Sequence, residues 1–166
     1  NDSIVNLTVV HNYYGINVTG SHDRISDSNV SYDGTGVTIN GKNDSVMRST
    51  VDNDGAGINI IGDNVSIVNS DVSDDGTGTI INGNNNSVMD STVSNSSNLG
   101  IKITGSYDSI VNLTVVHNYY GINVTGNNDS VLQSTVGYNY YGINVTGNND
   151  SIVNLTVVHN YYGINV

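Results

Sequence analysis

The chain has 166 residues, carries a formal net charge of −11 with only 4 Lys and Arg, and contains no Cys, Pro, Trp or Phe. The low number of basic residues argues against nucleic acid or an anionic membrane surface as a partner, because phosphate binding needs a basic surface. No stretch is long and apolar enough to span a bilayer, so we expect no membrane insertion. Val, Ile, Thr and Tyr favour strands while Asn, Gly and Asp favour turns, which together predict an all-β fold.

One sequence unit recurs from the first residue to the last. Residues 1–18 read NDSIVNLTVVHNYYGINV, residues 149–166 repeat them, and residues 107–124 differ only at the first position. Gly recurs once in each unit, every 21 residues with a single step of 22, at Gly15, Gly36, Gly57, Gly78, Gly100, Gly121, Gly142 and Gly163. This period predicts one solenoid domain, 1–166, with coils 1–21, 22–42, 43–63, 64–84, 85–106, 107–127, 128–148 and 149–166.

Each unit has the pattern of short strands joined by turns. Positions 4 and 9 of every unit are aliphatic, as in Ile4 and Val9. The run from Gly15 to Gly20 alternates with period two, which predicts a strand with Ile16 and Val18 inward. Three strands fit in one coil, no window has helical periodicity, and no capping helix is expected. Equal positions of neighbouring coils should stack about 4.8 Å apart.

The unit SIVNLTVVHNYYGINV, residues 3–18, resembles the right-handed parallel β-helix repeat. That repeat occurs in carbohydrate-binding and sugar-hydrolase-type domains, copper-maturation periplasmic proteins and surface proteins of methanogenic archaea. Near-identical, Cys-free copies are most similar to the self-assembling envelope and sheath proteins of that last group. The resemblance covers the whole chain and implies a single-stranded right-handed parallel β-helix of eight coils. It also implies an extracellular or cell-envelope location.

Acidic residues gather at one corner of the second, third and fourth coils. Asp33, Asp54 and Asp75 occupy the same repeat position, each followed by Gly. Stacked about 5 Å apart, three like charges repel, and an oxygen-liganded Ca²⁺ would relieve that repulsion. The other interpretation is that Asp-Gly simply makes good turns with solvated charges. Calcium is the cofactor that this acidic corner suggests.

The same corner is aromatic in the first and the last three coils. Paired tyrosines form a predicted ladder: Tyr13, Tyr14, Tyr119, Tyr120, Tyr140, Tyr141, Tyr161 and Tyr162. Such columns could bind sugar rings or a neighbouring rod, or only cap the core and stack on one another. His11, His117 and His159 lie beside the pairs and could ligate Cu²⁺ or Zn²⁺, although no Cys supports such a site.

Two further patterns concern the outer surface. Position 5 is mostly apolar, from Val5 through Met47 to Val153, and either marks an outward interface or turns inward at a bend. Asn-x-Ser/Thr sequons recur, and the candidates for N-glycosylation are Asn6, Asn17, Asn112, Asn123, Asn144 and Asn154. Without sugar, such Asn columns can form amide ladders.

The repeat suggests a structural protein that polymerises head to tail. Solenoids normally end in atypical capping repeats, whereas here the last coil copies the first. The predicted interface between two molecules comprises Ile4, Val9, Ile16, Val18, Ile152, Val157, Ile164 and Val166. Its partner is therefore another copy of this chain, in a filament, hoop or sheath. The alternative is a module that binds cell-surface polysaccharide. We expect no enzyme, because the loops are short and the basic residues are scattered.

Overall fold

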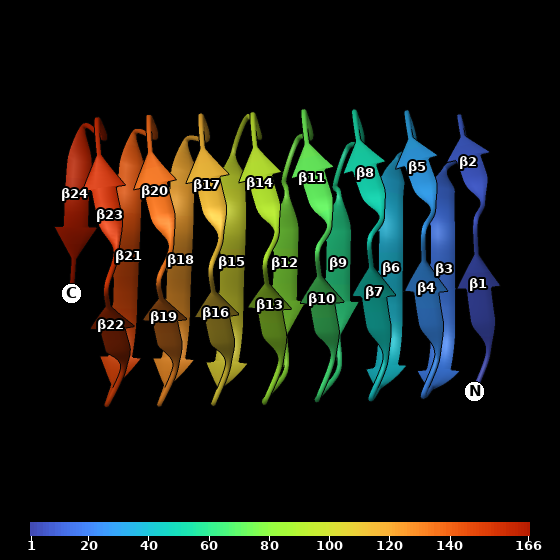
Figure 1. Cartoon of the computed structure of the whole chain (residues 1–166), viewed down its shortest axis with the longest axis horizontal. Coiled ribbons are helices and arrows are strands. Elements are labelled where there is room, and N and C mark those ends of the chain that lie inside the picture. Colours follow the sequence, from blue (N-terminus) through green and yellow to red (C-terminus); the bar gives the residue numbers. More distant parts are fainter.

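The computed structural model describes residues 1–166 as 24 strands and no helix. Three strands make one coil, and the coils stack side by side along a single axis (Figure 1). No element is a helix of the length and apolarity that crossing a membrane requires. The right-handed parallel β-helix of eight coils expected from the sequence is confirmed.

The strands form three parallel sheets of eight strands, each contributing one face of the rod. The first sheet contains β1 (Ser3–Val5), β4 (Arg24–Ser26), β7 (Ser45–Met47), β10 (Ser66–Val68), β13 (Ser87–Met89), β16 (Ser109–Val111), β19 (Ser130–Leu132) and β22 (Ser151–Val153). The second contains β2 (Thr8–Val10), β5 (Asn29–Ser31), β8 (Thr50–Asp52), β11 (Asp71–Ser73), β14 (Thr92–Ser94), β17 (Thr114–Val116), β20 (Thr135–Gly137) and β23 (Thr156–Val158). The third contains β3 (Tyr14–Ser21), β6 (Thr35–Lys42), β9 (Ile58–Ile61), β12 (Thr79–Asn82), β15 (Leu99–Ser106), β18 (Tyr120–Asn127), β21 (Tyr141–Asn148) and β24 (Tyr162–Asn165).

Strand pairing is in register, so each residue pairs with its equivalent in the next coil. Ile25 pairs with Val46, and Val30 pairs with Val51. The offset grows to 22 residues where Val88 pairs with Ile110, because the fifth coil is one residue longer. Equal side chains therefore form straight columns along the whole rod.

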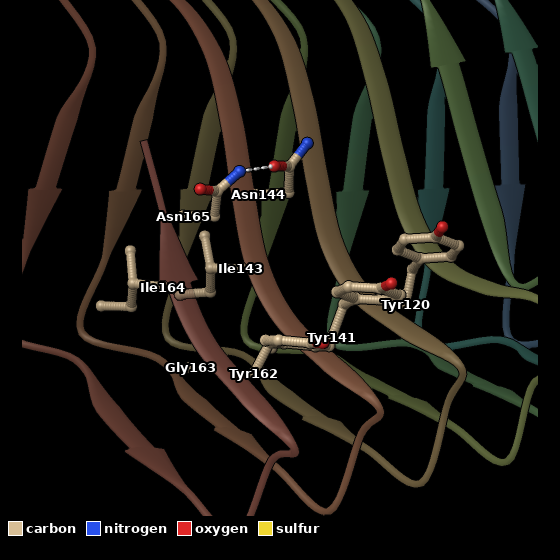
Figure 2. Close-up of a pocket in the computed structure, with 9 residues that line it drawn as sticks. Tyr120, Tyr141, Ile143, Asn144, Tyr162, Gly163, Ile164 and Asn165 are labelled. Atoms are coloured by element: carbon tan, nitrogen blue, oxygen red, sulfur yellow. Dashed lines mark hydrogen bonds between the residues drawn. The ribbon is translucent and has the colours of Figure 1, made fainter.

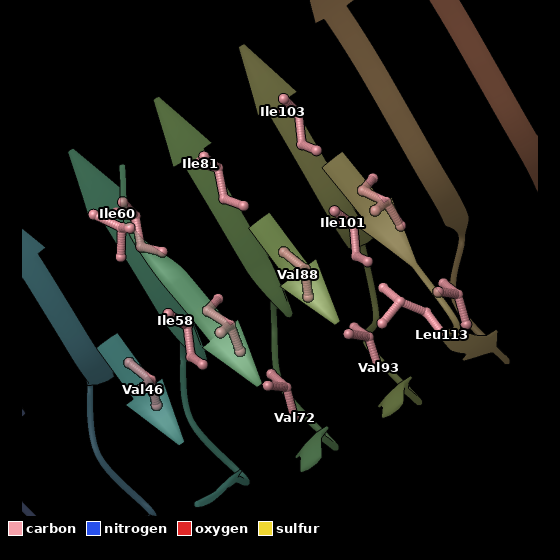
Figure 3. Packing of buried hydrophobic residues seen from close by; sticks show 14 of the residues in the cluster. Val46, Ile58, Ile60, Val72, Ile81, Val88, Val93, Ile101, Ile103 and Leu113 are labelled. Atoms are coloured by element: carbon pink, nitrogen blue, oxygen red, sulfur yellow. The ribbon is translucent and has the colours of Figure 1, made fainter. Parts of the chain in front are cut away.

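The core consists of these columns, filled almost entirely by Ile and Val. It contains 27 buried residues, and the aliphatic positions 4, 9, 16 and 18 supply most of them. Figure 3 shows Ile60, Ile81 and Ile103 of neighbouring third-sheet strands repeating the same inward placement. Each buried aliphatic contributes about 1.5–3 kcal/mol relative to exposure. The inward assignment of these positions from periodicity is confirmed.

Each corner of a coil turns on a single residue in the left-handed region. Positive φ angles near 57° recur at repeat positions 1, 6 and 11, for example at Asn6, Tyr32 and Asn64. Asn and Asp occupy most of these positions because they tolerate that conformation better than other side chains. The turn sends the next side chain inward, so positions 2, 7 and 12 form mostly polar buried columns, such as Ser28, Ser49 and Ser70. These columns lie at the corners, and where Val65 and Leu113 replace a polar residue they join the aliphatic core.

The side chains at position 5 fit neither an outward interface stripe nor an inward bend completely. Met47, Val68 and Met89 are half-buried, whereas Val5 and Val153 are exposed in the first and last coils. The side chains thus neither join the core nor stand fully out of it. An interface at this stripe stays a prediction.

Candidate functional site

Nine aromatic side chains gather at one corner of the last three coils. They sit between the second and third sheets and occupy repeat positions 11, 13 and 14. We call this set the aromatic face: His117, Tyr138 and His159; Tyr119, Tyr140 and Tyr161; Tyr120, Tyr141 and Tyr162. The regular coil spacing brings each column together, because position 14 begins the third-sheet strand and position 11 is the left-handed corner residue.

The tyrosines of each column stack face to face. The rings of Tyr119 and Tyr140 are 5.0 Å apart with planes 2° from parallel, and Tyr140 and Tyr161 are 4.8 Å apart at 5°. In the next column, Tyr120 and Tyr141 are 4.6 Å apart at 9°. These separations follow the strand spacing of about 4.8 Å, so the backbone sets the stacking distance. Figure 2 shows Tyr120, Tyr141 and Tyr162 one above another.

The two tyrosine columns meet edge to face and form an angled wall. Tyr140 and Tyr141 have ring centroids 4.9 Å apart with planes at 77°, and the other two coils repeat this geometry. Removal from water, together with the neighbouring phenols Tyr119 and Tyr120, raises the pKa of Tyr141. Its hydroxyl therefore stays protonated at neutral pH and can donate a hydrogen bond.

A shallow, wide-open groove runs between the position-11 column and the position-13 column. Tyr138 is sandwiched by His117 at 5.1 Å and 9° and by His159 at 4.8 Å and 5°. The groove has a volume of 710 Å³ and is lined by His117, Tyr138, Asn139, Tyr140, His159, Asn160 and Tyr161. None of its lining residues is acidic. The groove thus offers ring edges and phenol hydroxyls on both sides and imidazoles on the side of position 11.

Side-chain amides lie on the other flank of the aromatic face. Asn144 is three residues beyond Tyr141 on β21. Both residues line a pocket of 500 Å³, whose other lining residues are Tyr120, Gly142, Ile143, Tyr162, Gly163, Ile164 and Asn165. The Nδ2 of Asn165 donates to the Oδ1 of Asn144 at 2.7 Å, and that of Asn144 donates to Asn123 at 3.2 Å (Figure 2). The sequons at Asn123 and Asn144 are therefore half-buried in an amide ladder. Those at Asn6, Asn17, Asn112 and Asn154 are exposed.

The tyrosines of the first coil stand apart from the aromatic face. Tyr13 and Tyr14 contact each other edge to face at 4.7 Å. No tyrosine stacks on them from the second coil, because Gly34 and Thr35 occupy the equivalent positions there. The structure thus brings six of the eight predicted ladder residues together and separates the remaining pair from them by four coils.

The acidic corner of coils 2 to 4 has a different structure from the one expected. Asp33, Asp54 and Asp75 are 5%, 4% and 2% exposed, so the interpretation as solvated turn charges is wrong. The physical reason is the left-handed residue before each acid, which points the carboxyl inward. No group of three or more His, Cys, Asp or Glu is arranged to hold a metal ion. Neither the calcium site nor the histidine metal site therefore gains support from the geometry.

The predicted head-to-tail residues range from buried to fully exposed. Ile16 and Val18 lie in the core, while four others pack against it with partial exposure: Ile4, Val9, Ile152 and Val157. Ile164 and Val166 of the last coil are 51% and 88% exposed. Contact between copies of the chain at these residues stays a prediction.

Comparison with models of known protein families identifies the family of this β-helix. The profile described as "Right handed beta helix region" matches residues 14–165. The chain belongs to the right-handed β-helix family. No curated protein sequence matches this β-helix.

Among solved structures, the β-helix is similar to the tailspike protein gp49 from Pseudomonas phage LKA1, with a TM-score of 0.69 and 14% sequence identity. The match covers 90% of this chain but only 31% of the tailspike protein. At this identity the likeness shows a shared fold. The resemblance to archaeal sheath proteins has no counterpart among these matches.

Proposed function

We propose that the aromatic face binds a polysaccharide that lies along the rod axis, as a module of an extracellular or cell-surface protein. The observation that carries the proposal is the groove between two aromatic columns, to which each coil contributes a His or Tyr at position 11 and a Tyr at position 13. A repetitive groove suits a repetitive ligand, because each coil can offer the next sugar unit an equivalent set of contacts. The sequence resemblance to carbohydrate-binding domains supports the same conclusion.

The chemistry of the groove suits sugar rings. A pyranose has an apolar C–H face that packs on an aromatic ring, and hydroxyls that need hydrogen-bond partners. Tyr140 and Tyr161 supply ring edges and phenol hydroxyls, because neighbouring rings cover the faces within the column, while His117 and His159 supply ring nitrogens. On the other flank, the amide of Asn144 lies beside the ring of Tyr141. Aromatic stacking and amide contacts thus occur together on this side of the rod.

Rigidity favours binding at this face. Each ring is already held by stacking on its neighbours at 4.6–5.1 Å. Few rotamers therefore remain to be lost when a ligand binds, which lowers the entropic cost of association.

The test is equilibrium binding of the chain to a panel of polysaccharides by microarray and calorimetry. Tyr140→Ala should lower affinity for the bound polysaccharide about tenfold, as expected when about 1.4 kcal/mol of stacking is lost. Tyr140→Phe keeps the ring and should retain most of the binding. Tyr32→Ala removes an aromatic outside the face and serves as the matched control. Binding that survives Tyr140→Ala, or no binding to any polysaccharide, would contradict the proposal.

Head-to-tail assembly is the second candidate function. The observation in its favour is that Tyr13 and Tyr14, exposed at 79% and 52%, have the same sequence context as the stacked pairs of coils 6 to 8. A second copy placed after the eighth coil would extend both tyrosine columns. Electron microscopy and fibre diffraction test this candidate. Rods that remain monomeric at high concentration, without a meridional reflection near about 4.8 Å, would rule it out.

A further inference from the structure

The acids of coils 2 to 4 form one continuous hydrogen-bonded column. We call Asp33, Asp54 and Asp75 the acidic column. The Oδ1 of Asp54 accepts the backbone N–H of Asp33 at 2.6 Å, and the Oδ1 of Asp75 accepts that of Asp54 at 2.8 Å. Asp33 accepts the N–H of Asn12 in the same way. One oxygen of each carboxyl thus binds the coil before it.

The second oxygen of each carboxyl is buried without a partner. The Oδ2 atoms of Asp33, Asp54 and Asp75 have neither hydrogen-bond partners nor access to water. They lie so close to Gly15, Gly36 and Gly57 of the preceding coils that a Cβ there would collide with them. No space for a cation or a water molecule remains on that side.

No positive charge compensates these acids. The ion pairs of the structure use other acids, namely Asp23, Asp27 and Asp63. The charged groups that act on Asp54 are Asp33 and Asp52, and those that act on Asp75 are Asp54, Asp52 and Asp74. All of them are acids, which makes ionisation of the column more costly.

The same column in coils 6 to 8 shows how the second atom can be satisfied. There Asn118, Asn139 and Asn160 replace the acids, and their Oδ1 atoms accept the equivalent backbone N–H groups. The Nδ2 of Asn139 donates to the carbonyl of Val115 at 3.2 Å, and that of Asn160 donates to Val136 at 2.9 Å. A carboxylate cannot make this bond, whereas a protonated carboxylic acid can, because its O–H is a donor.

We propose that the acidic column is a proton-operated device, in which Asp54 and Asp75 are uncharged carboxylic acids in the folded chain and loss of their protons loosens coils 2 to 4. In the protonated form each Oδ2–H takes the place of the asparagine Nδ2–H. In the ionised form two buried charges face one another and the acids around them without a donor. The coils then separate at this corner to admit water, since each coil is held only by its neighbours.

Burial gives this device its pH range. Removal from water raises the pKa of Asp54 from an ordinary value of 3.8 to about 7, and raises the pKa of Asp75 to about 8. Because the folded-state pKa values are raised, the stabilisation is complete below about pH 4 and is lost as the pH rises to about 8. These two acids thus make the folded chain more stable at pH 5 than at pH 8.

The experiment measures urea unfolding of the whole chain at pH 5, 6, 7 and 8 at fixed ionic strength. The folding equilibrium constant of the wild type should fall at least about a hundredfold from pH 5 to pH 8. The double variant Asp54→Asn, Asp75→Asn should show a nearly flat profile between pH 6 and pH 8. Burial also raises the pKa of Asp108, to about 6, so its contribution is confined to lower pH in both proteins. Asp90→Asn, at an exposed position and not among the acids that act on Asp54 or Asp75, should keep the wild-type profile.

A second measurement uses the wild-type protein alone. The side-chain carboxyl ¹³C resonances of two aspartates should titrate above pH 6 in the folded state, which also decides the matter if the double variant fails to fold. The proposal is overturned if every aspartate titrates below pH 5, or if the wild type and the double variant lose stability in parallel between pH 6 and pH 8.

Discussion

Coils 2 to 4 and coils 6 to 8 share one backbone and one aliphatic core, yet their third corners differ in charge and in the number of aromatic rings that they expose. In coils 2 to 4, Gly follows the inward acid and the outer surface carries Asp52 and Asp74. In coils 6 to 8, two tyrosines follow an inward asparagine and the outer surface is aromatic and free of acids. This difference shows that one set of residues determines the stability of the solenoid and another set determines its surface chemistry. Aliphatic columns hold the coils, while three or four corner residues decide what each coil presents to solvent.

The shared core can be tested by the same truncation in both regions. Ile58→Ala in coil 3 and Ile122→Ala in coil 6 remove equivalent, fully buried side chains. Each should destabilise the chain by about 3–4 kcal/mol, through lost burial and a residual cavity. Chemical denaturation measures both. Costs that differ by more than about 2 kcal/mol would mean that the two cores are not equivalent.

Replacing the inward asparagine of the aromatic region by aspartate should make the stability of that region depend on pH, as proposed for coils 2 to 4. Asn139→Asp removes the Nδ2 donor to the carbonyl of Val115 and buries a carboxyl. At pH 8 we expect a loss of about 3 kcal/mol, because a buried charge is left without a hydrogen-bond donor. At pH 4 protonation should restore most of the stability. An equal loss at both values would contradict the role given to the proton.

Aromatic stacking should matter more where the columns are continuous. Tyr141 contacts Tyr120, Tyr140 and Tyr162 at 4.6–5.0 Å, whereas Tyr32 stacks on His11 alone at 5.4 Å. Tyr141→Ala should therefore cost about 2 kcal/mol and Tyr32→Ala about half of that. Thermal unfolding of the two variants gives the order. The comparison fails if Tyr32→Ala is the more damaging change.

The smallest effect should come from the surface ion pairs of the acidic region. Arg48 donates to both carboxylate oxygens of Asp27 at 2.7 and 2.8 Å, and Lys42 pairs with Asp63 at 2.7 Å. These groups are solvated, so water and salt screen their attraction. Arg48→Gln should change the unfolding midpoint less than any of the buried substitutions, and the change should shrink as salt is added. A change as large as that of Ile58→Ala would overturn this ranking.

Much of the fold follows from the sequence because one period governs it. The 21-residue repeat and the alternation of Ile16 and Val18 predicted coils, strands and core columns. The columns of Tyr140 and Tyr141 could be predicted too, since equal positions must stack. The inward orientation of Asp54 could not, because alternation ends at the corner and Asp-Gly is equally typical of a solvated turn. Its only sequence signal is the residue before it, Asn53, which is favoured in the left-handed conformation.

The groove of the aromatic face could be predicted from the sequence only in part. The sequence places His117 and Tyr138 next to the tyrosine pairs, but not at what distance or angle. The placement of the position-11 column beside the position-13 column depends on the left-handed φ of Tyr138 and on the inward position of Asn139. Both are corner properties, which hydrophobic periodicity does not report. The backbone geometry at the turns thus determines the orientation of the corner side chains, which the pattern of apolar residues does not predict.

In-register pairing between nearly identical coils has a consequence for folding. Coils 1, 6 and 8 share almost the same residues, so a chain that folds with one coil skipped would keep most Ile and Val contacts. The corner residues penalise such a slip through their side chains, because it would set Asp75 against an asparagine coil or interrupt the tyrosine columns, although the backbone pairing would be kept. The longer fifth coil, where the pairing offset becomes 22 residues, penalises it as well. We therefore infer that the variable corner residues and the single inserted residue favour the native order of coils over misregistered pairing.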